Sequence, residues 1–147
     1  MDKVKYSAGL NEFSYCATLH ISHPTIDPSQ ITAALQIEPS RMSRVGQAHR
    51  SVLGRVYYFS HWSSKLPAKD HDDIPTILAR LVSQLSRHRN YLHELSDSGA
   101  EIECFIGIFT TRLCDQQYSH ILLAMLADLR IDLRLDFYSE NSNQPSA

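Results

Sequence analysis

Residues 13–21 alternate strictly between apolar and polar side chains, which is the pattern of a strand with one buried face. The buried side is expected to consist of Phe13, Tyr15, Ala17, Leu19 and Ile21. An aromatic-rich stretch predicts a second strand over about residues 55–62. A third strand is expected over residues 101–111. Because Phe105 and Phe109 make its second face apolar too, it should lie at the centre of the sheet.

A fourth strand is predicted over residues 131–138, where apolar residues alternate with charges of changing sign. Its inward side chains are expected to be Ile131, Leu133, Leu135 and Phe137. Its outer face would carry Asp132, Arg134 and Asp136, as fits a strand with one solvated side.

Three helices are predicted between these strands. The first begins at Asp27 as N-cap with Pro28 in the first helical position, and it stops before Pro39. A long amphipathic helix is expected over residues 74–95, with Gly99 as a left-handed terminator. The last helix is predicted over residues 118–129, and its buried side chains are expected to be Ile121, Leu122, Met125, Leu126 and Leu129.

This order of elements favours an α+β fold: a two-layer sandwich with a mixed four- to five-stranded sheet and helices mainly on one face. The link between the third and fourth strands is long enough for a parallel crossover. A length of 147 residues suits one domain over 1–147, with an ordered core at about 12–140 and flexible termini. Residues 141–147 have the composition of a disordered tail.

The amino-acid composition limits which cellular compartment and which classes of binding partner are expected. The formal net charge of −2 gives no global attraction for nucleic acid or an anionic membrane, so neither is expected as a partner. Three widely spaced cysteines fit a reducing cytoplasm better than a disulfide framework. No apolar run approaches the roughly 20 residues needed to span a bilayer, and residues 1–11 lack the apolar segment of a signal peptide.

The eight histidines and three cysteines do not have the spacing of a metal site, because no Cys-x-x-Cys knuckle and no i,i+4 histidine pair on a helix occurs. We therefore expect no structural zinc and no cofactor. Cys104 is expected in the core, and Cys114 lacks a base at catalytic distance. Glycine-rich phosphate loops and nucleophile elbows are absent from the sequence, so no catalytic residue is assigned.

A long polar segment between the first helix and the second strand holds the residues best suited to a ligand. Four arginines fall within residues 41–55, and guanidinium groups match carboxylate and phosphate. The speculative ligand-binding set is Arg41, Arg44, Gly46, Arg50 and Trp62, with His49 and Arg55 beside them. The alternative is a solvated basic loop with Trp62 as a core or rim anchor.

Several landmarks, taken in order, resemble one protein family. They are Asp27-Pro28, Ile31, Leu35, Ile37, Pro39-Ser40, Gly46, Trp62, Leu129-x-Ile131 and Asp136-x-Tyr138. Together they resemble the bacterial domain-of-unknown-function family 4279 over about residues 13–138. The resemblance implies a small cytoplasmic bacterial domain without an assigned activity, and it supplies no catalytic residues.

Two functions stay open. The first is a non-catalytic cytoplasmic binding or interaction module for a protein partner or a small anionic ligand. The alternative is a small enzyme that acts on an anionic metabolite through the Arg41–Arg55 loop. A homodimer is also considered, with the fourth strand or the last helix in self-association, because opposite charges along a strand can match their copies across a two-fold axis.

Overall fold

The computed structural model describes residues 2–140 of the chain. Its strands are β1 (Val4–Ala8), β2 (Asn11–His23), β3 (Arg41–Ser43), β4 (Ser60–Lys65), β5 (Glu101–Thr110) and β6 (Asp132–Ser139). Its helices are α1 (Ser29–Leu35), α2 (Ile74–Leu85), α3 (Arg89–Asp97) and α4 (His120–Asp128), with a 3₁₀ turn at Ser86–His88 between α2 and α3. The predicted tail at 141–147 lies outside the described residues.

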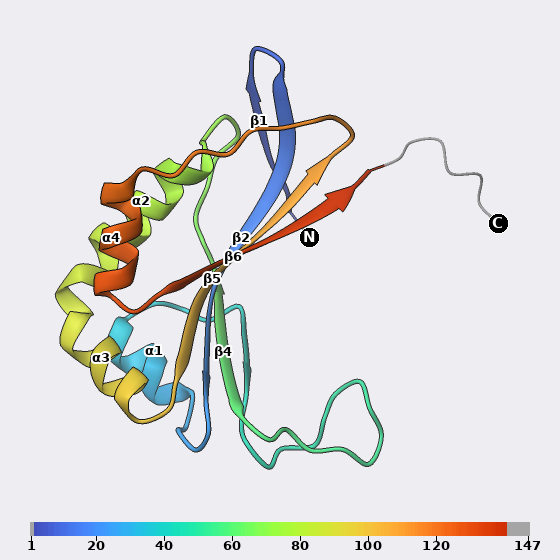
Figure 1. Cartoon of the computed structure of the whole chain (residues 1–147). Helices are drawn as coiled ribbons and strands as arrows, with labels where there is room; N and C mark the ends of the chain where they lie inside the picture. Colours follow the sequence, from blue (N-terminus) through green and yellow to red (C-terminus); the bar gives the residue numbers. More distant parts are fainter. Residues whose placement is uncertain (1, 141–147) are drawn as a thin grey trace.

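All six strands form one mixed sheet in the order β3-β4-β2-β5-β6, with β1 also paired to β2 (Figure 1). Strand β2 is long enough to pair with β1 along its first part and with β4 along its second part, while β5 lies along its other edge. Every pairing is antiparallel except β5–β6, which is parallel, as the long connection through α4 predicts. Strand β5 is central, also as predicted.

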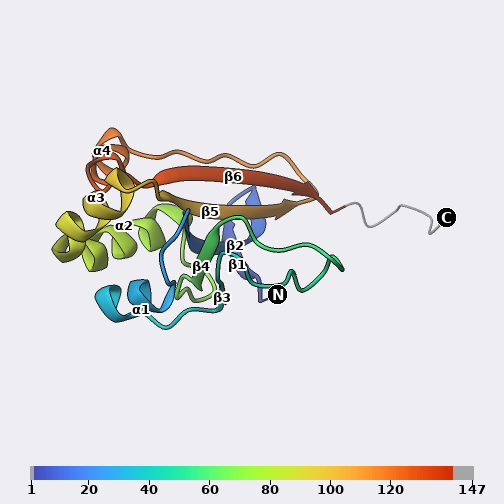
Figure 2. The ribbon, with the colours of Figure 1, turned by 90° about the horizontal axis from the view of Figure 1, so that it is seen from below.

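Helices α1 to α4 gather on one side of the sheet, and within residues 2–140 no helix lies on the opposite side (Figure 2). The inward residues of β2 pack with those of β5 and the helices in a single hydrophobic core. The predicted α+β class with helices on one face is therefore confirmed. The sheet has more strands than the four to five expected, because β1 and the three-residue β3 are too short to produce a recognisable period.

The predicted single helix over residues 74–95 is wrong, because α2 and α3 are separated by the 3₁₀ turn. The chain from Ser86 to Asn90 is polar without interruption, so it has no apolar side chain to bury and the apolar stripe stops. The stripe resumes with Leu92 and Leu95, which are buried. Gly99 follows α3 with φ 107°, as predicted for a left-handed terminator.

Three further predictions need correction. The sequence predicts the second strand over residues 55–62, but β4 covers Ser60–Lys65, and residues 55–59 belong to an irregular hairpin. Of the residues predicted inward on the last helix, Ile121 and Met125 are 58% and 47% exposed. Apolar residues surround almost the whole of α4, so their spacing does not define one buried face. Phe137, predicted inward, is 60% exposed because it lies near the end of β6.

Helix α1 begins within one residue of its predicted start. The Asp27 carboxylate accepts hydrogen bonds from the Ser29 backbone N–H at 3.0 Å and the Ser29 hydroxyl at 2.8 Å. The helix ends where Gln36 adopts a left-handed conformation, before Pro39. Among residues 2–140, no helix is long and apolar enough to cross a membrane.

Candidate functional site

The helix-free face of the sheet carries polar side chains in rows that the strand register aligns. His20 of β2 lies opposite Ser63 of β4 on one side and opposite Glu103 of β5 on the other. His61 of β4 is a diagonal neighbour of His20, and the two imidazole rings stack with their centroids 5.5 Å apart. Arg41 of β3 extends the same row, because it pairs with Ser63.

Residues 44–59 form an irregular hairpin that extends β3 and β4 and projects beyond the helix-free side of the sheet (Figure 1). Backbone hydrogen bonds join its two arms: Gly46 N–H donates to the Tyr57 carbonyl at 2.8 Å, and His49 N–H donates to the Arg55 carbonyl at 2.7 Å. Its base is fixed by Ser60, whose buried hydroxyl accepts from Val45 N–H and donates to the Ile26 carbonyl. The hairpin is therefore hydrogen-bonded rather than a free loop.

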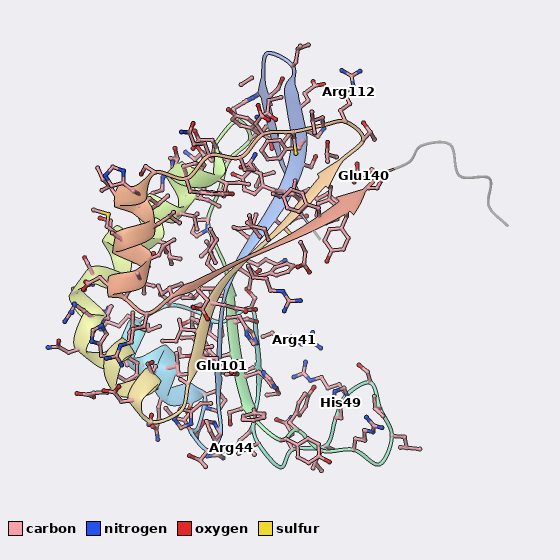
Figure 3. All side chains as sticks on the ribbon, in the orientation of Figure 1. Arg41, Arg44, His49, Glu101, Arg112 and Glu140 are labelled. Atoms are coloured by element: carbon pink, nitrogen blue, oxygen red, sulfur yellow. The ribbon has the colours of Figure 1, made fainter. Side chains whose placement is uncertain are left out.

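The hairpin adds two more rings to the histidine pair. His49 stacks on Tyr57 at 4.6 Å, and Tyr57 meets His61 edge-on at 5.9 Å. The result is a continuous row of four rings from β2 through β4 to the hairpin. In Figure 3, Arg41 and His49 lie on the side of the sheet away from the helices, whereas Arg44 lies apart from them at the lower end.

A pocket of about 380 Å³ lies between the sheet and the hairpin. Its lining residues are His20, Arg41, Ser43, His49, Tyr57, His61 and Ser63. Every one of these side chains can donate a hydrogen bond, and none is a carboxylate. We call this cavity the donor pocket.

A second hollow, of about 340 Å³, lies on the other side of the histidine pair and shares His20 and His61 with the donor pocket. It is lined by both signs of charge, since Glu101, Glu103 and Arg134 border it. An anionic group is therefore accommodated better in the donor pocket than in this neighbour.

Burial lowers the pKa of both shared histidines. The pKa of His20 falls below its usual value of 6.5 because the ring is desolvated, an effect that Glu103 partly offsets. The pKa of His61 falls for the same reason and because His20 lies beside it. Both rings are consequently neutral at pH 7, and each can donate one hydrogen bond and accept another.

Only some of the residues proposed from the sequence meet at this pocket. Arg41 lines it, whereas Arg44 forms an ion pair with Asp27, its Nη2 lying 2.7 Å from Oδ2. Gly46 has φ 82°, so its role is to allow the hairpin backbone to turn. Arg50 does not line the donor pocket.

Trp62 lies on the opposite face of β4 from His61 and is fully buried in the core. Its indole N–H donates a hydrogen bond to the Thr32 hydroxyl at 3.0 Å, which ties β4 to α1. The structure thus places Trp62 as the core anchor considered in the sequence analysis, away from the donor pocket.

Sequence reasoning did not select His20, His61, Tyr57 or Ser63 as site residues. The signal available was the alternation along two strands, which places His20 on the polar face of β2 and His61 on the face of β4 opposite to Trp62. Within residues 2–140, no group of three or more histidine, cysteine or acidic side chains is placed to hold a metal ion.

Comparison with known proteins gave one match. A family model described as "Domain of unknown function (DUF4279)" matches residues 11–140, from the start of β2 to the residue after β6. The matched region includes every strand that lines the donor pocket and leaves out β1. No curated protein and no solved structure matches the chain.

Proposed function

The chain belongs to the DUF4279 family, and on that footing we propose that it is a non-catalytic binding module of the cytoplasm whose donor pocket holds a small anion. One observation carries the proposal: seven side chains that can donate hydrogen bonds line one pocket without a carboxylate among them. Carboxylate and phosphate groups are the ligands that such a set of donors recognises.

The size of the pocket favours a small ligand. A volume of about 380 Å³ lies near the lower end of the usual range for ligand sites, about 300–1,000 Å³. Arg41 is exposed and supplies a fork of donors for a bidentate contact. Tyr57 and the histidines add single donors on rings that their neighbours hold in place. The ligand class is therefore a compact metabolite with one phosphate or carboxylate group.

The two shared histidines give the proposed site a pH dependence. Both are neutral at pH 7 because their pKa values are lowered, and an anion bound beside them would favour their protonated forms. Affinity for an anion that keeps its charge should therefore rise as the pH falls from 7 towards 6.

The cytoplasmic part of the proposal is supported by the thiols. Cys16, Cys104 and Cys114 are all free, as expected in a reducing compartment.

The test is a thermal-shift titration with inorganic phosphate, sulfate and acetate, followed by calorimetry for any anion that stabilises the protein. A ligand at 100 times its Kd stabilises the native state by about 2.7 kcal/mol. Arg41→Ala should abolish the shift. Arg50→Ala is the matched control, because it removes the same charge from the adjoining hairpin at a position outside the pocket. The proposal would be contradicted if Arg41→Ala and Arg50→Ala reduced the thermal shift equally, or if neither variant reduced it.

The alternative is an enzyme acting on an anionic metabolite in the same pocket. The observation in its favour is the neutral imidazole of His61, which could accept a proton from a bound ligand at pH 7. Chemical change of a stabilising anion during incubation, lost in His61→Gln, would support the enzyme. An anion recovered intact would support the binding module.

A further inference from the structure

Strand β6 forms one edge of the sheet. Among residues 2–140 its only strand partner is β5, so the backbone groups on its outer side pair with no other strand. Exposed edges of this kind recruit further strands unless charges, bulges or coverings prevent it. The chain from Asp132 to Ser139 contains no proline and has a regular register along its whole length. Residues 132–138 are therefore competent to pair on the side of the strand away from β5.

The side chains of β6 separate into a charged face and an apolar face. Asp132, Arg134 and Asp136 share the helix-free face of the sheet, because Arg134 lies beside Phe105 and Asp132 lies beside Glu103. Leu133 and Leu135 pack against the core from the opposite face. Phe137 continues this apolar row but is 60% exposed.

This alternation limits how a second copy can pair with β6. In an antiparallel pair, side chains directly opposite each other lie on the same face, so the charged faces of both copies must coincide. A two-fold axis at Arg134 would place Arg134 opposite itself and Asp132 opposite Asp136, which sets like charges together. An axis at Leu135 instead places Arg134 opposite Asp136 twice, and it overlaps the strands from Asp132 to Tyr138.

The apolar faces match in the same register. With Leu135 opposite its copy, Phe137 of one molecule lies opposite Leu133 of the other. Leu133 borders an open depression of about 540 Å³ that Leu123 and Ala127 of α4 also line. The exposed Phe137 ring of one copy thus comes next to the apolar side chains at the rim of this depression in the other copy, although Glu101, Arg130 and Asp132 line the depression as well. Symmetry repeats this contact.

We propose that two copies of this chain associate through antiparallel pairing of β6, with Leu135 on the two-fold axis and reciprocal Arg134–Asp136 ion pairs. The pairing joins the two sheets into one and covers Phe137. It uses neither Arg41 nor any other residue that lines the donor pocket, so it stands independently of the proposed ligand.

Sedimentation velocity over a dilution series up to tens of micromolar tests the pairing. The wild type should move from monomer to dimer as concentration rises. Arg134→Asp and Asp136→Arg should each weaken association about tenfold or more, because each turns two attractive pairs into two repulsive ones. Both side chains are partly exposed, so circular dichroism should show that both variants fold.

The decisive step is to mix the two variants. In the proposed register, a chain with the Arg134→Asp substitution meets a chain with the Asp136→Arg substitution, and opposite charges face each other at both pairs. The mixture should therefore form a heterodimer about as tightly as the wild type. An ion pair within one chain, such as Arg134–Asp136 at 3.3 Å, cannot explain that rescue. Three results would each overturn the proposal. They are a wild type that stays monomeric, single variants that associate as tightly as the wild type, and a mixture that associates no more tightly than either variant alone.

Discussion

Replacement of Trp62 with alanine tests most clearly which face of β4 is buried in the core. The indole is fully buried and donates its N–H to Thr32. Replacing a buried tryptophan with alanine costs about 3–5 kcal/mol, a large share of the roughly 5–15 kcal/mol that stabilises a domain. At about 2–4 °C per kcal/mol for a chain of this size, Trp62→Ala should lower Tm by about 6–20 °C. Thr32→Val should cost about 1–3 kcal/mol, because it leaves the indole N–H buried without its acceptor.

Urea unfolding followed by far-UV circular dichroism is the appropriate assay, since Trp62 is the only tryptophan and its fluorescence disappears in the variant. His61→Ala is the matched control, because it alters the adjacent residue of the same strand on the opposite face. It should cost about 1 kcal/mol or less. A Trp62→Ala cost below about 1 kcal/mol, or equal costs for the two variants, would refute this assignment of the faces.

Two further predictions concern histidine protonation and thiol reactivity. The Nδ1 atom of buried His23 accepts the N–H groups of Thr25 and Ile26, and burial lowers its pKa. In the unfolded chain the pKa of His23 is about 6.5, so below this pH the unfolded chain binds more protons than the folded protein. The free energy of unfolding should therefore fall as the pH is lowered from about 7 to about 5. Urea unfolding that gives the same or a higher free energy at pH 5 would contradict this. Burial raises the pKa of Cys104 to about 12, so iodoacetamide should modify half-buried Cys114 first in the native protein, and mass spectrometry showing earlier modification of Cys104 would disprove it.

Much of the fold can be predicted from the sequence, because several segments show a clear periodic pattern of apolar and polar residues. The strict alternation over residues 13–21 and the apolar segment at 101–111 correspond to β2 and β5, the two central strands. The sequence misplaces β4 because the buried face of this strand is mostly serine: the hydroxyls of Ser60 and Ser64 donate to the carbonyls of Ile26 and Glu38 inside the fold. A buried serine with a hydrogen-bond partner gives no apolar signal, so the aromatic residues before it predict the strand too early.

The candidate site depends on strand order more than on local sequence. Arg41 could be selected because arginines cluster around it, but His20 and His61 are 41 positions apart and become neighbours only through the β2–β4 register. The direction in which the Trp62 side chain points likewise depends on which face of β4 packs against α1. Charge density along the chain therefore pointed to the hairpin that borders the donor pocket, while long-range strand pairing determines which residues line that pocket.

The central claim is that an anion binds in the donor pocket, and a two-dimensional ¹H–¹⁵N NMR titration with inorganic phosphate tests it most directly. We predict saturable shifts of backbone amides at residues 41–43, 49, 57 and 61–63, with the largest near Arg41 and Ser63, and their loss in Arg41→Ala. The absence of saturable shifts, or shifts centred on the hairpin tip at residues 50–55, would contradict the claim.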